Sequence, residues 1–302
     1  MSISAVPNRA RTTGTKRPVR WSPAFVLIFA LCSTRCWSAQ PPRAAVEAYK
    51  RAVTAVGQRE PLACPAGNES ASAIIIRRLP VEDSANHAVR PEGALIHHWW
   101  AAMFLKHVRA EDVLAVLQDY NHHADIYAPE VRSSNLVDKR GEHYHVLHET
   151  LSRSLVTVGL KIDSVIDWSR DKQDGFSSHS TTTHVTEFEQ AGTPRARERT
   201  PDQAKGWMWA EDSWWHVSTK ADGACVTYET IALTRDIPWG WGWLLRGMVE
   251  RFPAKTLTDM LNRTRSAVLS RKGINLTVGL SAAVAFPDNA QTKHAESKNS
   301  QP

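Results

Sequence analysis

The sequence of 302 residues lacks the short motifs that mark many enzymes and nucleotide-binding proteins. It contains no Gly-rich phosphate loop, no Gly-x-Ser-x-Gly nucleophile elbow and no His-Glu-x-x-His motif. It has no internal repeat, and its apolar runs are too short to span a bilayer comfortably. The motifs therefore give no support to an ATPase, an α/β-hydrolase or a zinc protease, and no cofactor is expected.

Excess positive charge is missing outside the first residues, although the whole chain has a formal net charge of +6. Residues 1–38 contain six of the 37 Lys and Arg residues and no acid, so the remaining chain has 31 residues of each sign. Because no basic footprint for phosphates is left, the sequence predicts no nucleic-acid partner. With 42% hydrophobic residues, the chain can fold around a sizeable core.

The first residues of the chain are typical of an export signal. A basic stretch precedes the apolar run 24–32, and small residues follow it. Cleavage after Ser38 leaves small Cys36 at position −3, whereas cleavage one residue later would leave bulky Trp37 there. We therefore expect residues 1–38 to be a signal peptide and the protein to be exported, periplasmic or extracellular. An N-terminal membrane anchor is the alternative.

Cysteine is scarce, because the chain has four and only Cys64 and Cys225 remain after removal of the signal. In an oxidising compartment these two could form one disulfide that closes a very long loop. Two small, buried and unpaired side chains are an equally good interpretation. Both interpretations stay open at the level of the sequence.

The order of the predicted elements organises the rest of the chain. The stretch 94–108 is predicted to be a strand covered on both sides, because both of its alternating sets are apolar. Two short helical segments follow, and then about six antiparallel strands. A last helix is broken or restarted at Pro253. Side chains at helical spacing give that helix an inward stripe, made up of Leu257, Leu261, Thr264 and Val268.

Four regions are expected along the chain. Residues 1–38 are the signal, and residues 39–93 are an N-terminal extension that packs onto the main domain. Residues 94–272 form that domain, and residues 273–302 form a polar tail that is largely disordered.

Several short motifs accompany this order of elements. They are His97-His98-Trp99, Leu117-Gln118-Asp119-Tyr120, Gly192-Thr193-Pro194-Arg195, Thr234-Arg235-Asp236-Ile237-Pro238 with Gly240 and Gly242-Trp243, and Thr264-Arg265. Over roughly residues 94–270 the chain resembles the START-like (SRPBCC) superfamily of polyketide cyclases and lipid-transfer domains, in particular uncharacterised exported bacterial members. The resemblance implies an α+β helix-grip fold, in which an antiparallel sheet wraps around a long C-terminal helix and leaves a cavity. The superfamily shares this cavity and no catalytic set.

The resemblance and the tryptophans together predict a hydrophobic ligand. Ten of the twelve tryptophans follow the signal, and their wide indole faces suit an apolar cavity. The expected ligand-binding residues are Trp100, Trp239, Trp241, Trp243, Leu257, Leu261 and Arg265. The expected partner is a hydrophobic small molecule or lipid, with transient membrane contact at the tryptophan-rich turn. A core filled by the same side chains is the alternative.

A cyclase- or dehydratase-type enzyme is the competing hypothesis. His145 and Glu149 share a strand face and Glu229 lies on the last strand, so a cavity histidine and carboxylate could move a proton next to a carbonyl. Solvated surface charges explain the same residues without catalysis. His143 and His145 could supply two zinc ligands, but the spacing indicates no third, and no metal site is expected.

Overall fold

The computed structural model describes residues 40–64, 73–153, 156–171, 175–236 and 242–273, with side chains described from residue 253 onward in the last range. The predicted signal peptide, Trp239, Trp241 and residues 274–302 of the predicted tail lie outside these ranges, as does the side chain of Trp243.

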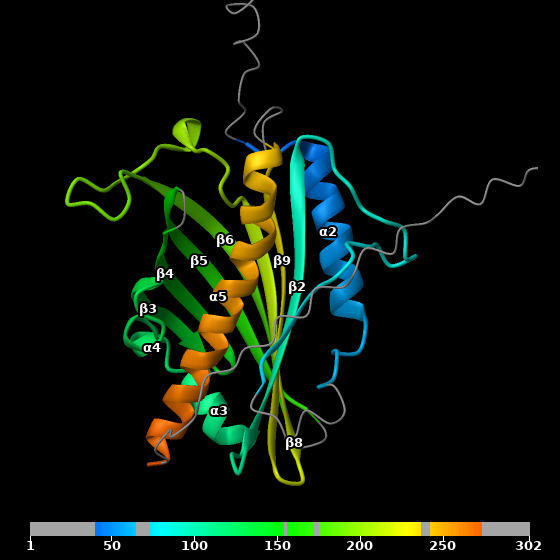
Figure 1. Cartoon of the computed structure of the whole chain (residues 1–302), viewed down its shortest axis with the longest axis vertical. Coiled ribbons are helices and arrows are strands. Elements are labelled where there is room, and N and C mark those ends of the chain that lie inside the picture. The colour runs from blue at the N-terminus through cyan, green and yellow to red at the C-terminus, as the bar shows by residue number, and fades with distance from the viewer. Residues whose placement is uncertain (1–39, 65–72, 154–155, 172–174, 237–241, 274–302) are drawn as a thin grey trace, which may run out of the picture. The chain divides into compact units, whose positions relative to one another are not determined.

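One antiparallel sheet and four α-helices make up the described residues (Figure 1). The helices are α2 (Arg43–Gln58), α3 (Ala110–Leu117), α4 (His123–Ile126) and α5 (Gly242–Arg271), with 3-10 turns at Tyr120–His122 and Pro201–Gln203. The strands are β1 (Ile75–Arg78), β2 (Ala94–Lys106), β3 (Val131–Arg140), β4 (His143–Arg153), β5 (Thr157–Arg170), β6 (Phe176–Glu189), β7 (Arg197–Glu198), β8 (Ala210–Lys220) and β9 (Gly223–Arg235). Their order in the sheet is β1-β2-β9-β8-β6-β5-β4-β3, and β7 pairs with β6.

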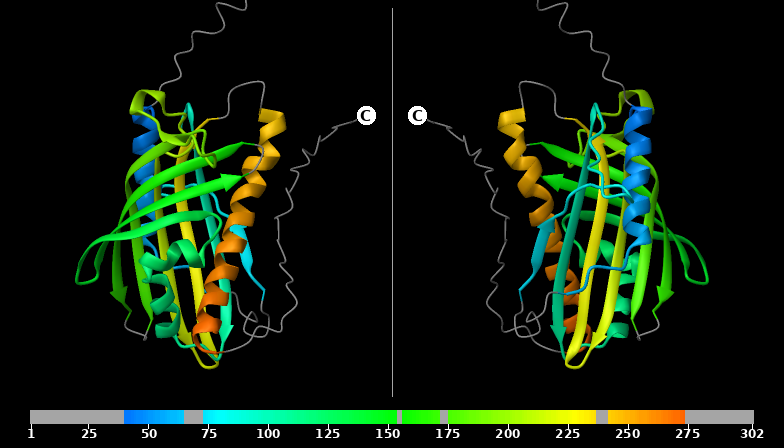
Figure 2. Two further views of the ribbon diagram at one scale, coloured as in Figure 1. Left: turned by 90° about the vertical axis from the view of Figure 1, so that its left-hand side faces the viewer. Right: turned by 90° about the vertical axis from the view of Figure 1, so that its right-hand side faces the viewer.

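The two long helices lie on opposite faces of this sheet. Figure 2 shows α5 on one side of the strands and α2 on the other. We call the face toward α5 the inner face and the face toward α2 the outer face. The sheet bends around α5, which is the helix-grip arrangement that the order of elements predicts.

Alternation along β2 assigns its side chains to the two faces. Trp99 and Met103 belong to the core that contains Leu261 of α5, whereas Ile96 packs with Ala48 of α2. Because successive residues of a strand point to opposite sides, odd-numbered residues of β2 face inward and even-numbered ones outward. The strand is therefore covered on both faces, as its apolar sequence predicts.

The segment before β2 contributes both a cover and a strand. The helix α2 buries small residues such as Ala45 and Ala52 against the outer face. β1 pairs with β2, with Ile75 opposite Ala102. The range 39–93 thus adds an edge strand to the sheet in addition to its outer cover.

Cys64 and Cys225 form a disulfide across 161 residues of sequence, with their Cα atoms 6.1 Å apart. Odd-numbered residues of β9 face outward, because even-numbered Val226 belongs to the inner core while Ile231 packs with α2. The disulfide therefore fastens the segment after α2 to the outer face of the central strands.

The helix α5 is continuous through Pro253, which corrects the predicted break. A proline inside a helix removes one backbone hydrogen bond and crowds the preceding turn. A helix of 30 residues keeps its other bonds, and Ala254 and Leu257 just beyond the proline are buried against the sheet. The predicted stripe does face inward, since Leu257 is 6% exposed and Leu261 0%.

Candidate functional site

One half of the inner face is tightly packed. Met103 of β2, Val146 of β4 and Val226 of β9 are 0% exposed and share a core with Leu261 of α5. Helix α3 closes the same core, with Val113 buried against it. We call this region the packed half.

The other half of the inner face is partly exposed. It lies toward the end of the sheet where β9 ends and α5 begins (Figure 1). Successive residues of a strand alternate between the two faces, so apolar and polar side chains of β2, β5, β6, β8 and β9 lie on this part of the inner face. Each of these side chains keeps some exposed surface. We call it the open half and define it by Leu95, His97, Ile162, Val185, Glu211, Ser213 and Ala232.

Glu211 brings a carboxyl group into the open half. It lies on β8 on the same face as Val217, which is part of the inner core. Thr230 of β9 donates a hydrogen bond to Glu211 Oε1 at 2.8 Å. Burial raises the pKa of Glu211 and the charge of Asp212 raises it further, while the Thr230 hydrogen bond opposes both effects. The carboxyl group is therefore less acidic than a free one.

His97 lies on the inner face of β2, and Ala232 of β9 separates it from Glu211. Ala232 is in register with His97 on one side and with Glu211 on the other. His97 Nε2 lies 3.0 Å from Thr234 Oγ1 in a hydrogen bond. Burial, helped by the charge of Arg78, lowers the pKa of His97 to about 4. The imidazole is therefore neutral at neutral pH.

The three residues predicted for acid–base chemistry do not meet in the interior. His145 and Glu149 are odd-numbered residues of β4 and face outward, since Tyr144 and Val146 occupy the inner core. Glu229 faces outward from β9, where it accepts a hydrogen bond from His98 Nε2 at 2.6 Å and pairs with Arg59. Strands β5, β6 and β8 lie between β4 and β9. This corrects the expectation that the three line one cavity.

Among the predicted ligand-binding residues, Trp100 also faces outward. It is an even-numbered residue of β2, is 3% exposed, and has the Arg77 guanidinium 5.7 Å from its ring centroid. Leu257 and Leu261 contact the packed half directly and fill the core there. Trp239, Trp241 and the side chain of Trp243 lie outside the described residues.

Arg265 is a half-buried cation beside the packed half. Among the described residues its Nη2 atom is buried without a hydrogen-bond partner, and its Nη1 atom donates to Asn262 Oδ1 at 3.5 Å. Burial lowers the pKa of Arg265. A guanidinium in this state is costly to keep in the fold, because a buried charge needs a partner.

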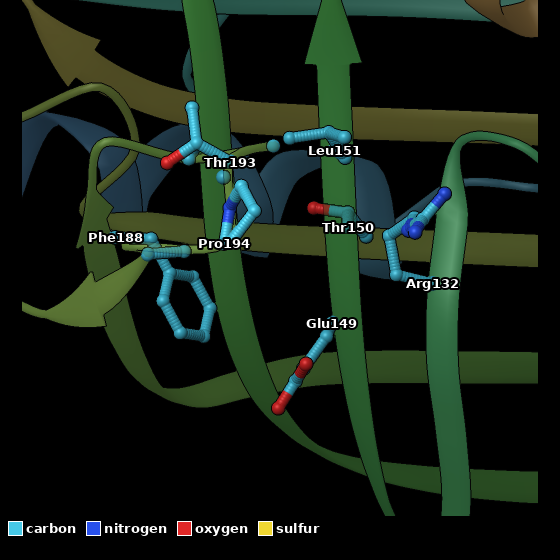
Figure 3. Close-up of a pocket in the computed structure, with 11 residues that line it drawn as sticks. Arg132, Glu149, Thr150, Leu151, Phe188, Thr193 and Pro194 are labelled. Carbon is cyan, nitrogen blue, oxygen red and sulfur yellow. The ribbon is translucent and has the colours of Figure 1, made fainter.

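A separate surface groove of about 400 Å³ lies on the outer face (Figure 3). Its floor is formed by β3 to β6 and its wall by the loop after β6. Gly159 lets this loop approach, because a Cβ there would lie 2.7 Å from the Cβ of Ala191. Arg132 and Glu149 supply the charges of the groove, with Leu151 and Phe188 as apolar lining. The groove is therefore an amphipathic surface feature and not the predicted interior.

The outer-face histidines pair with aspartates. His143 Nδ1 lies 2.6 Å from Asp167 Oδ1, and His145 Nε2 hydrogen-bonds with Asp163. Within the described ranges, no three or more His, Cys, Asp or Glu side chains are grouped closely enough to hold a metal ion. None of the described helices has both the length and the apolarity to cross a membrane.

Sequence reasoning missed Glu211 and the role of His97 in the open half. The strand that contains Glu211 is predictable, but two adjacent tryptophans, Trp214 and Trp215, hide which of its faces is the inner one. The available signal is the apolar residue Val217. Every second residue along the strand shares the face of Val217, and Glu211 is one of these residues.

No family model matches the sequence, and no curated protein matches it. Among solved structures, a STAR-related lipid transfer protein from Xanthomonas axonopodis is 19% identical with a TM-score of 0.42, over 60% of this chain and 96% of that one. An aromatase/cyclase, Zhui, from a Streptomyces species is 14% identical with a TM-score of 0.40, over 59% and 96%. The human StAR-related lipid transfer protein 5 is 10% identical with a TM-score of 0.43, over 76% and 98%.

The fold follows from the topology of the chain itself, with an antiparallel sheet, two short helical segments after β2 and a long last helix across the inner face. The protein has the START-like helix-grip fold.

Proposed function

We propose that the protein is an exported carrier that binds or transfers a hydrophobic small molecule or lipid between the sheet and α5. The observation that carries this proposal is the open half of the inner face. Leu95, Ile162 and Val185 present partly exposed apolar surface there, on a face that the rest of the fold turns inward. Apolar surface in such a position gains free energy when a ligand covers it.

The packed half gives the carrier a rigid base. Each square ångström of apolar surface that the ligand covers contributes about 25 cal/mol, and little of this is lost to rearrangement if the wall is already ordered. Met103 and Leu261, both fully buried, hold the sheet and α5 at a fixed spacing below the open half. One or two polar groups of the open half then orient the bound molecule.

Export is supported by the pairing of Cys64 with Cys225. Structural disulfides persist in oxidising compartments and are rare in the cytosol. Cell fractionation of the native host, with N-terminal sequencing of the mature protein, tests this part of the proposal. We expect the protein outside the cytosol with a mature chain that starts after Ser38, and a cytosolic chain with an intact start would contradict it.

Native mass spectrometry of the protein purified from its own host tests the carrier function. We expect a bound species that organic extraction removes and identifies as an apolar molecule. Ile162→Trp fills the open half and lowers the bound fraction, whereas Val165→Trp on the outer face of the same strand leaves it unchanged. A protein without any bound species that also fails to take up added lipid would contradict the proposal.

A cyclase- or dehydratase-type enzyme is the second candidate. The observation that favours it is the presence of a carboxyl group, Glu211, and a neutral imidazole, His97, on the same inner face. Such a pair can move a proton next to a carbonyl. The extract from the native host separates the two candidates. An enzyme carries a product that differs from its precursor by ring closure or loss of water, and Glu211→Gln carries only the precursor.

A further inference from the structure

We propose that Glu211 anchors the head group of the ligand, and that this head group is a hydrogen-bond donor without negative charge, such as a hydroxyl. The inference rests on the proposed carrier function and names the class of molecule carried. A carboxylic acid or a phosphate of the same chain length is then the wrong ligand.

One oxygen of the Glu211 carboxyl group is free to accept a hydrogen bond. Thr230 occupies Oε1, at 2.8 Å. Within the described residues no donor binds Oε2, and Oε2 is not among the side-chain atoms that are sealed from solvent without a partner. This atom therefore keeps some exposed surface, and because Glu211 lies on the inner face, we infer that a ligand donor in the open half reaches it.

The space beside the carboxyl group is lined by small side chains. Ala232 of β9 stands directly across from Glu211, and Ser213 follows on the same face of β8. The apolar part of the ligand then extends toward Ile162 and Val185, which are neighbours on β5 and β6.

The charges near Glu211 disfavour a second anion. Asp212, the next residue on the strand, raises the pKa of Glu211, and among the described side chains no cation lowers it. Arg78 acts on His97 at the other side of Ala232, on the edge strand β1, and Arg265 lies beside the packed half. A ligand carboxylate placed at Oε2 would lose its hydration and face a like charge. A hydroxyl meets neither cost.

Three ligands with the same chain test the inference: dodecanol, dodecanoate and dodecylamine. Their affinities are measured at neutral pH by displacement of the neutral probe N-phenylnaphthylamine. We expect dodecanol to bind at least about tenfold more tightly than dodecanoate, because a hydrogen bond to a charged group and the avoided repulsion together exceed 1.4 kcal/mol, the equivalent of tenfold. Dodecylamine is expected to bind at least as well as dodecanol.

The variant Glu211→Gln keeps the size of the side chain and the Thr230 contact while it removes the charge. We expect it to reduce the preference for dodecanol over dodecanoate to less than about threefold, since an amide can also donate to a carboxylate. The matched control is Glu149→Gln, the same chemical change on the outer face, which leaves the preference unchanged.

The outcomes separate this inference from the carrier function. If no dodecyl compound binds to the unmodified protein, the carrier function fails. If all three bind equally, or if Glu211→Gln keeps the full preference, the carrier function stands and Glu211 is not the anchor. Should Glu211→Gln not fold, the series on the unmodified protein decides, because equal affinities there overturn the inference.

Discussion

The packed and open halves of the inner face share strands, and they differ in the exposure of their side chains. On β9, Val226 in the packed half is 0% exposed, whereas Ala232 in the open half is partly exposed. On β2, Met103 is 0% exposed, whereas His97 on the same face is partly exposed. A binding surface can therefore arise where the packing of one face of a sheet is incomplete, without a change in the backbone architecture.

Truncation of a side chain in each half gives the largest expected contrast. Leu261→Ala in the packed half should lower the free energy of unfolding by about 2–5 kcal/mol, because the side chain is fully buried and its neighbours only partly fill the cavity that it leaves. Ile162→Ala in the open half should cost less than about half of that, since its side chain is already partly exposed. Urea denaturation with the disulfide intact measures both. Equal losses would show that the two halves are packed alike.

Acidification tests how far the packed half and the open half exclude water. Burial lowers the pKa of His123 in the packed half and of His97 in the open half to about 4 each. In the unfolded chain each histidine binds a proton near pH 6.5, whereas in the folded protein it does so only near pH 4. The unfolded state is therefore favoured as the pH falls from about 6.5 toward 4, and the free energy of unfolding decreases in that window. A decrease from about pH 7 to about pH 5 should cost about 2 kcal/mol for each histidine.

The variants His123→Gln and His97→Gln should each remove their share of this pH dependence, as urea midpoints at several pH values would show. If the open half is freely hydrated, His97 titrates close to its ordinary pKa instead. In that case His97→Gln leaves the pH dependence of stability unchanged, while His123→Gln still reduces it.

The guanidinium of Arg265 gives a smaller test. Arg265→Met removes a partly buried cation that has no ion partner among the described residues, so the unfolding free energy should stay unchanged or rise by up to about 1 kcal/mol. The control is Arg263→Met, which breaks the 3.4 Å ion pair with Glu130 and should not stabilise the fold. Loss of ligand affinity in Arg265→Met would instead identify Arg265 as the anchor and would favour an anionic ligand.

The smallest effect is expected on the outer face. Glu149→Gln alters the surface groove and should change the unfolding free energy by less than about 0.5 kcal/mol. Binding of dodecanol should be unaffected, because Glu149 points away from the inner face. A clear loss of dodecanol binding in this variant would move the ligand from the open half to the groove.

The fold could be predicted because its signals are local. The doubly apolar pattern of β2 and the helical spacing of Leu257 and Leu261 are visible in a single stretch of sequence. The site was harder to predict from the sequence, because alternation shows which residues share a face of the sheet but not which face is the inner one. On β4 the buried pair Tyr144 and Val146 marks the inner set, and this places His145 outside.

On β9 no such mark exists, because both alternating sets contain apolar residues. Val226 and Ile231 are both fully buried, one under α5 and the other under α2. The outward position of Glu229 therefore depends on the packing of α2, which lies some 170 residues away in the sequence. Contacts between such distant segments cannot be deduced from the pattern of one strand.

The disulfide between Cys64 and Cys225 closes a covalent ring that includes β1 to β8 and the start of β9. The chain leaves this ring before α5, so the covalent connection of the last helix to the ring runs through the end of β9 alone. The position of α5 over the inner face therefore depends on noncovalent packing, such as that of Leu261, and the ring itself does not restrain the helix.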